Sequence, residues 1–355
     1  MGQGGTESSS SGPAAVRGSR RGSDYADLVR LARARGLLDR QPGFYAYRIA
    51  LNLGLYALGL ALLPRLDGTL PLALDAVLLA FVFGQASFFG HDAAHGQISA
   101  SRRRNEWLAL FNFSLLLGLS VTWWRDHHDP HHVHPNDLRH DPDLRVGPLA
   151  FAPEQATAKR GILRWVTKFQ SALFYPLLLL EGFHIRYRSI VVLARSNSPQ
   201  ARIEALLIAV HLLVFHGYVL AVLGLADGLA FLVLQLALTG LYVGSVFAPN
   251  HTGMPVIHDG RRVDALQRQV ITARNVAGNA LVDFCWGGLN YQIEHHLFPR
   301  LARNKLAETR RLVKPFCASK GIPYHETSVI RSVVEVVQGL HRASAPLRAS
   351  GRRAE

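Results

Sequence analysis

Histidines in three short clusters are the side chains of this sequence best suited to chemistry. Nine of the 17 histidines lie in the segments HDAAH (91–95), HHDPHHVH (127–134) and QIEHH (292–296). Within each cluster, residues stand three or four positions apart, a spacing that puts side chains on one face of an α-helix. Each cluster therefore predicts a helix that presents a row of two or three ligands, mostly imidazole nitrogens, which bind transition metals well.

These donors are more numerous than one metal ion requires. A structural zinc ion takes four ligands and a catalytic one three, so seven or more histidines indicate two ions. Imidazoles without thiolates suit iron, copper, nickel or zinc. His251, in the segment PNHTG, lies where it could reach the same centre. Side chains that could accept hydrogen bonds from the outward ring N–H groups are Asp92, Asp129, Asn136, Asp141, Asp143, Asp283 and Glu294.

Apolar segments determine where these clusters lie. Four are long enough for a helix to cross a bilayer, which takes about 20 residues; they are roughly residues 47–63, 70–89, 203–225 and 229–249. The short turns PRLDGT and LADG join them into two expected helical hairpins. Shorter apolar stretches at 107–121 and 172–183 are typical of buried or interfacial segments, not of spans. The predicted fold class is an all-α integral membrane protein with four transmembrane helices and a cytosolic helical cap that holds the metals.

Basic residues predict the orientation. The hairpin turns hold Arg65 and no other Lys or Arg, whereas the N-terminal tail, segment 101–105, segment 159–202 and the C-terminal third are rich in arginine. By the positive-inside rule, both termini and the histidine clusters are expected on the cytoplasmic side of a multi-pass cell-membrane protein. The cap would comprise residues 90–202 and 250–342, with amphipathic helices at 301–316 and 328–341 closing the site.

Composition narrows the function classes. The chain has 39 Lys and Arg against 25 Asp and Glu, a net charge of +14. Because this charge marks one side of the membrane, we expect no nucleic-acid partner. Two cysteines exclude a disulfide scaffold and an iron–sulfur cluster, which needs about four ligands. Residues 1–24 and 343–355 are expected to be disordered tails, and residues 25–342 one domain that opens with an amphipathic surface helix at 25–38.

At its histidine clusters the sequence resembles the membrane fatty acid desaturases. The matching motifs are HDAAH (91–95), HDPHH (128–132) and NYQIEHHLFP (290–299), with APNHTGMP (248–255), DPD (141–143) and GIPYHE (321–326). The similarity runs from about residue 40 to residue 340. The QIEHH form resembles the acyl-CoA or acyl-lipid branch. Front-end desaturases of that branch often carry an N-terminal cytochrome b5 domain with an HPGG motif, and this sequence has none.

This resemblance implies a non-haem di-iron centre that works with dioxygen. The ligands it implies are His91, His95, His128, His131, His132, His295 and His296, with His251 and Gln292 as ligands or close partners of ligands. The implied reaction is the introduction of a cis double bond into a fatty acyl chain held by CoA or a lipid. The sequence has no GxGxxG after a strand and no b5 motif. We therefore expect a separate electron donor, ferredoxin-like or cytochrome b5-like, with its reductase.

The acyl chain would need an apolar tunnel from the membrane to the metals. Aromatic candidates for its wall, for which ordinary packing is an equally good interpretation, are Phe88, Phe89, Trp123, Trp124 and Trp286. A hydroxylase of the same superfamily is the nearest alternative function. A membrane metal transporter or sensor is a weaker one, because transporters hold ligands near the bilayer midplane. A haem carrier would use His211 and His216, which fit packing or lipid contact better.

Overall fold

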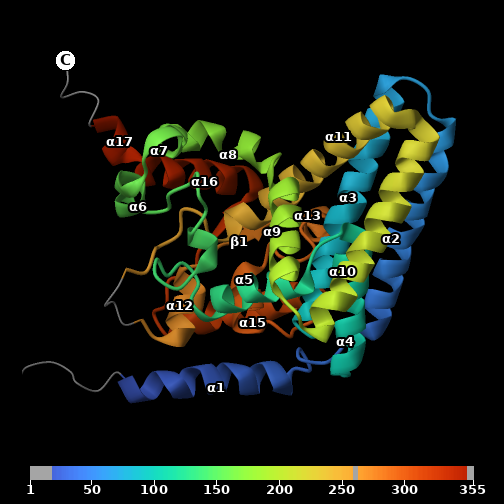
Figure 1. Ribbon diagram of the computed structural model, residues 1–355. Helices are drawn as coiled ribbons and strands as arrows, with labels where there is room; N and C mark the ends of the chain where they lie inside the picture. The colour runs from blue at the N-terminus through green and yellow to red at the C-terminus, as the bar shows by residue number, and fades with distance from the viewer. Residues whose placement is uncertain (1–17, 259–262, 350–355) are drawn as a thin grey trace, which may run out of the picture.

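The computed structural model describes residues 18–258 and 263–349, and these residues are mostly helical (Figure 1). The predicted all-α class is confirmed except for one small sheet. Strands β1 (Asn275–Ala277) and β2 (Glu326–Ser328) pair in parallel and join the region around the third histidine cluster to the C-terminal helices.

Three helical runs are long and apolar enough to cross a membrane: Pro42–Arg65, Thr69–Ala94 and Pro199–His251. The first two contain α2 (Pro42–Leu62) and α3 (Thr69–Ala94), which pack together at the right of Figure 1. Pro42 is the first residue of α2. The backbone N–H that proline lacks would have no partner within the helix at this position. Both helices are apolar over most of their surface, as helices surrounded by protein and lipid are.

The third run has 53 residues, more than twice the number that crosses a bilayer. It comprises α10 (Pro199–His211), a π-helical turn (Leu212–His216) and α11 (Gly217–His251). The backbone leaves helical geometry at Gly224, with φ 75° and ψ 177°, a conformation open to glycine because it has no Cβ. The break falls one residue before the LADG segment, where a turn was expected, and residues 225–228 are helical.

The shorter apolar stretch at 107–121 is not one straight helix. It runs from α4 (Arg102–Ala109) through a second π-helix (Leu110–Leu116), and α5 (Val121–Val133) follows. The two parts are bent by 115°. At the bend, the buried Glu204 of α10 accepts hydrogen bonds from Ser120 Oγ at 2.6 Å and Thr122 Oγ1 at 2.7 Å. These bonds fix the start of α5, which carries the second histidine cluster.

The remaining helices lie at the left, centre and bottom of Figure 1, with the surface helix α1 lowest. They are α1 (Gly18–Ala34), α6 (Pro153–Ala158), α7 (Gly161–Lys168), α8 (Gln170–Leu178), α9 (Glu181–Arg195), α12 (Ala265–Ile271), α13 (Ala280–Cys285), α14 (Gln292–Leu297), α15 (Leu306–Ser319), α16 (Val329–Ala343) and α17 (Ala345–Ala349). The start of α9 crosses α11 closely, since a Cβ added to Gly240 would lie 2.5 Å from the Gly182 nitrogen.

Helices occur in parts of both segments that were expected to be disordered tails. Helix α1 already begins at Gly18, and its buried Leu28 and Ala32 belong to the core around α15. At the other end, Leu347 of α17 is buried with Ala150 and Ala156 of the α6 region. A single leucine in a polar segment gives no periodic signal, so the sequence did not predict this contact. Residues 1–17 and 350–355 lie outside the described part.

Candidate metal centre

The three histidine clusters lie on helices, as their spacing predicts. His91 is in the last turn of α3 and His95 caps it; the second cluster is on α5 and the third on α14. His251 is the last residue of α11. All nine predicted site residues come together where these four helix segments meet, although up to 205 positions separate them in the sequence (from 91 to 296).

Five histidines form a first group: His91, His95, His128, His132 and His295. One ring nitrogen from each lies within 4.8 Å of all the others. The Nε2 atom of His128 lies 3.0 Å from that of His95 and 3.0 Å from that of His132. His132 Nε2 in turn lies 3.1 Å from His295 Nε2. The five rings therefore converge on one point from three helices.

Three further histidines form a second group beside the first: His131, His251 and His296. The Nε2 atoms of His251 and His296 are 3.0 Å apart. The side-chain amide of Gln292 lies 3.0 Å from His251 Nε2, so this amide borders the second group. Helices α5 and α14 each contribute to both groups, through the neighbours His131 and His132 and the neighbours His295 and His296.

The donor set fits two metal ions. Bonds of about 2.0–2.1 Å from an ion to imidazole nitrogen separate neighbouring ligands at right angles by about 3 Å. The observed Nε2–Nε2 distances of 3.0 to 3.1 Å match this value. The Nε2 atom of His91 is buried without a hydrogen-bond partner among the described residues. A buried polar atom left in this way is costly, and an ion at the shared point would satisfy it.

Burial keeps most of these rings neutral. It lowers the pKa of His295 and of His296 well below the ordinary value, and the neighbouring histidines lower it further. A neutral ring has a free lone pair for a metal. His131 differs: burial alone would lower its pKa, but the Asp143 and Asp141 carboxylates outweigh burial and bring it to about 9. The same carboxylates would attract a metal cation to this ring.

Four of these histidine rings have a hydrogen-bond acceptor on their outward nitrogen. His91 Nδ1 lies 3.1 Å from Asp92 Oδ1, and His131 Nδ1 lies 3.0 Å from Asp141 Oδ2. Such partners select the tautomer and make the inward nitrogen a better donor. The sequence suggested Asp92 and Asp141, but Asp283 and Glu294 bond other residues, namely Asn290, Tyr291, Asn275 and Tyr324. For Asp129 no contact with a histidine is seen among the described residues.

Two partners of the second group were missed by the sequence analysis. His296 Nδ1 lies 2.8 Å from Gln269 Oε1, and His251 Nδ1 lies 2.9 Å from the Thr272 carbonyl oxygen. Both partners come from α12 and the residue that follows it. A glutamine outside the motifs and a backbone carbonyl carry no recognisable sequence signal, and only the folded chain reveals them.

Buried polar side chains hold the segment around His251. The Arg274 guanidinium donates to the Pro249 carbonyl at 2.7 Å and the Thr252 carbonyl at 3.1 Å. Its Nε lies 3.0 Å from Glu335 of α16. Asn136 adopts a positive φ of 54° and donates its amide to the His251 carbonyl at 3.1 Å. The C-terminal helix α16 thus supports the segment around His251 through Arg274.

A second network supports the first group at His91. Asp92 accepts a hydrogen bond from the Tyr45 hydroxyl at 2.9 Å and one from Arg303 Nε at 2.5 Å. All three side chains are buried. The guanidinium of Arg303 also lies 4.7 Å from the centroid of the Phe89 ring. The start of α2 and the segment after α14 are thereby tied to the carboxylate that orients His91.

Aromatic rings border the first group on one side. The Trp124 ring stacks on His128 with centroids 4.3 Å apart, and the Phe247 ring lies 6.3 Å from His91. Of the five aromatic residues expected to line a tunnel, Trp124 contacts the histidines of this group most directly. Phe88 and Trp286 instead pack with Phe247 in a small apolar cluster.

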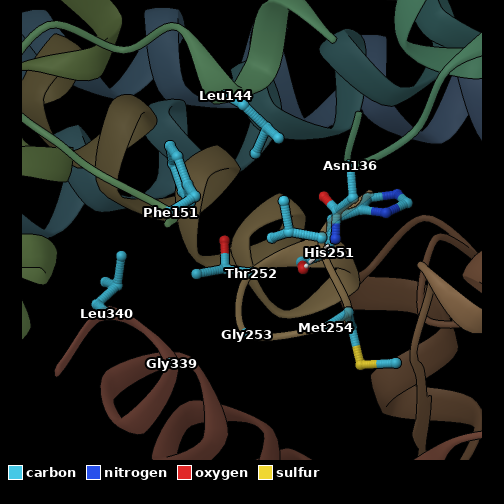
Figure 2. A pocket seen from close by; sticks show the side chains of 10 residues that line it. Asn136, Leu144, Phe151, His251, Thr252, Gly253, Met254, Gly339 and Leu340 are labelled. Carbon is cyan, nitrogen blue, oxygen red and sulfur yellow. Dashed lines mark hydrogen bonds between the residues drawn. The ribbon is translucent and has the colours of Figure 1, made fainter. Parts of the chain in front are cut away.

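The hollow beside the second group is small. Figure 2 shows it between the His251–Met254 turn, the Asn136 loop and α16. Its volume is about 20 Å³, enough for about one water molecule. Pockets that hold organic ligands measure about 300–1,000 Å³. This hollow is therefore not the expected acyl tunnel, and a chain can enter here only if side chains move.

Sequence comparison identifies the family. The sequence model of the family described as fatty acid desaturase matches residues 68–328, which include all three histidine clusters and His251. The chain belongs to the fatty acid desaturase family. The predicted resemblance is thus confirmed. Together with its three apolar helical runs, membership of this family makes the chain a membrane protein.

Fatty acid desaturases of several distantly related organisms are similar to this chain. The chain is 31 % identical to a Delta(8)-fatty-acid desaturase of Euglena gracilis over 328 residues, 86 % of this chain and 76 % of the relative. It is 26 % identical to an acyl-lipid (9-3)-desaturase of Physcomitrium patens, over 89 % of this chain and 62 % of the relative. It is 29 % identical to a Delta(6)-fatty-acid desaturase of Caenorhabditis elegans, over 70 % of this chain and 60 % of the relative. The chain thus spans about three fifths of the length of two of these three relatives.

Proposed function

We propose that this chain is a membrane di-iron desaturase that introduces a cis double bond into a fatty acyl chain bound to CoA or a lipid. The observation that carries the proposal is the pair of imidazole groups, five histidines beside three, built from the motifs that fall in the family match. Dioxygen would be the co-substrate. A separate ferredoxin-like or cytochrome b5-like protein, with its reductase, would supply the electrons.

One iron would be held by the five-histidine group, and the other by His131, His251 and His296 with Gln292 beside them. When bound, the two irons supply the redox chemistry that removes hydrogen from an unactivated methylene, which no side chain performs. The protein's own contribution is to hold the ligands. Asp92 and Asp141 accept hydrogen bonds from the Nδ1 atoms of His91 and His131, and they thereby aim the opposite ring nitrogens at the ions.

The surrounding side chains also exclude water from the centre. Trp124 covers His128, and both His91 and His295 are about 1 % exposed. An acyl chain contains no group that a polar site can grip near the reacting carbons, so its position depends on an apolar wall. Since a misplacement of about 1 Å can cost about 100-fold in rate, we assign Trp124 and Phe247 to the part of the wall nearest the metals.

We also propose four membrane spans in two hairpins. The 53-residue run supplies two of them, with its reversal at Gly224. The basic segments and the metal centre then lie on the cytoplasmic side of the cell membrane, together with both termini, in accord with the positive-inside rule. One catalytic domain would extend across residues 25–342, which include the family match at residues 68–328. Arginines exposed on that side suit anionic lipids and an acidic donor.

The test is expression with a matched electron donor, followed by mass analysis of the extracted lipids. The expected product is an acyl chain lighter by two hydrogens, with its double bond located by fragmentation. His128→Ala should abolish the product, whereas His140→Ala, which removes an exposed histidine bonded to Asp137, should not. A product heavier by one oxygen atom would replace desaturase with hydroxylase. Metal transport into liposomes without any lipid product would overturn the enzyme proposal.

A further inference from the structure

A half-buried arginine outside the metal centre lies among neutral partners. Arg186 of α9 donates to His216 Nε2 at 3.1 Å through Nη1. Through Nη2 it donates to His211 Nε2 at 3.1 Å and to the Leu117 carbonyl at 3.1 Å. No carboxylate contacts this guanidinium among the described residues. A charge that is partly removed from water and has no counter-charge is unfavourable, so the arrangement requires an explanation.

Carboxylates on the neighbouring elements are already engaged. Glu181, on the same helix, lies 3.4 Å from His184. Glu204 of α10 accepts its bonds from Ser120 and Thr122 at the start of α5. Burial lowers the pKa of Arg186 from 12.5 to about 10, and the group therefore remains charged at neutral pH.

The local backbone brings both histidines to the guanidinium. His211 and His216 are five residues apart, and in an α-helix such residues point about 140° away from each other. The wider π-helical turn Leu212–His216 brings them to one side, with ring centroids 5.4 Å apart. Such turns occur frequently at functional sites. Here the π-turn lets two neutral rings hold one cation.

The histidine tautomers leave donors without acceptors. Because arginine only donates, the Nε2 atoms of His211 and His216 must accept, and both rings carry their hydrogen on Nδ1. His211 donates this hydrogen to the Leu115 carbonyl at 3.1 Å. The Nδ1 atom of His216 is buried and has no partner among the described residues. The Nε–H of Arg186 and one Nη1–H also have no acceptor in the described part of the chain.

The surroundings suit the tail of a lipid. Arg186 itself is half-buried, so a ligand can reach it from outside. Tyr187 on the same helix is 64 % exposed, and Leu213 and Val214 on the π-turn are 76 % and 63 % exposed. Helices α9 and α10 pack side by side, as Figure 1 shows. Exposed tyrosine, leucine and valine side chains therefore occur on the two elements that hold this cation with its unused donors.

We propose that Arg186, held between His211 and His216, binds the anionic headgroup of an amphiphile whose apolar tail lies along α9 and the π-turn. A lipid phosphate and a fatty-acid carboxylate share the necessary chemistry: negative charge and several acceptor oxygens. The site is separate from the metal centre, and its occupation does not depend on desaturation. It would hold an amphiphile beside the span that carries His211 and His216, and the anion would neutralise the guanidinium charge.

Native mass spectrometry of the purified full chain tests this proposal. The protein is released from detergent after incubation with phosphatidylglycerol, with oleate or with uncharged diacylglycerol. Retention of phosphatidylglycerol or oleate, but not diacylglycerol, is expected, and whichever anion is retained identifies the source. Arg186→Gln should weaken retention about tenfold or more. Arg188→Gln, which removes an exposed charge from the same helix, should retain the anion as the wild type does.

A second variant covers the case in which Arg186→Gln does not fold. His216→Glu places a carboxylate beside the guanidinium and should fold, because it supplies the missing counter-charge. It should also lose the bound anion, since the new carboxylate competes for the same donors. Equal retention by the wild type and a folded Arg186→Gln or His216→Glu protein would overturn the proposal, as would a wild type that retains no anion.

Discussion

Asp141→Asn should separate the two metal sites. The Asp141 carboxylate is fully buried and lies 3.0 Å from His131 Nδ1. It also accepts the backbone N–H of Asn136 at 2.7 Å and that of Asp143 at 2.9 Å. An asparagine keeps the shape but loses the charge, and it offers one oxygen where two are used. We expect iron to be lost from the group that contains His131 and kept by the five-histidine group.

The magnitude follows from the electrostatics of His131. Its pKa rises from 6.5 to about 9 although burial acts in the opposite direction. That rise corresponds to about 3 kcal/mol of attraction for a cation at this ring. Asp141 shares this effect with Asp143, so about half would be lost. Metal affinity at the second group should therefore fall about 10–100-fold, as it typically does when a side chain that hydrogen-bonds a metal ligand is replaced.

The assay is iron content per chain in purified protein, measured as chelator concentration is raised. The wild type should lose its two irons together or nearly so, whereas Asp141→Asn should lose one at about 10–100-fold lower chelator concentration. Asp126→Asn makes the same change of charge on the exposed face of α5 and should match the wild type. If a folded Asp141→Asn protein kept both irons with wild-type resistance, the assigned role of this carboxylate would be refuted.

Three other substitutions test further parts of the structure. His251→Ala should leave about one iron per chain and no desaturated product; an unchanged iron content would remove His251 from the site. Glu204→Gln removes charge-assisted bonds at the start of α5 and should lower the free energy of unfolding by about 2–3 kcal/mol, seen as a lower thermal midpoint; an unchanged midpoint would contradict this role. Gly240→Ala puts a methyl group 2.5 Å from the Gly182 nitrogen and should destabilise the protein by about 1–3 kcal/mol. Gly54→Ala, where a Cβ meets nothing within 4 Å, is its control, and equal midpoints for the two variants would show that the close helix crossing has no such effect.

Helical periodicity explains which parts of the site the sequence could predict. His128, His131 and His132 stand at a spacing that only a helix puts on one face, and the structure has α5 there. The same reasoning could not divide them between two groups. That division depends on which neighbouring helix each ring faces, and long-range packing between α3, α5, α11 and α14 decides it.

Breaks within helices, and contacts between residues far apart in the sequence, were harder to predict. Composition suggested a turn at residues 225–228. The helix instead breaks at Gly224, because one residue with positive φ is enough to interrupt the helical backbone. Neither π-helix has a sequence signature. From the sequence, Arg186 was one of several arginines that could meet an acidic donor, CoA phosphates or anionic lipid headgroups, and nothing indicated its two histidine partners. Partners such as Gln269 and Thr272 become visible only when α12 packs against α14.

The division of two pairs of adjacent histidines between the groups has a consequence for how reactivity can vary. His131 and His132 point to different groups, and so do His295 and His296. Each pair is joined by a single peptide bond within a helix, so the separation of two bound ions would be set by the rigid geometry of one helical turn. Loops and neighbouring helices can shift without stretching it. A change of reaction outcome or of the carbons attacked would therefore have to come from moving the acyl chain relative to a fixed pair of metals.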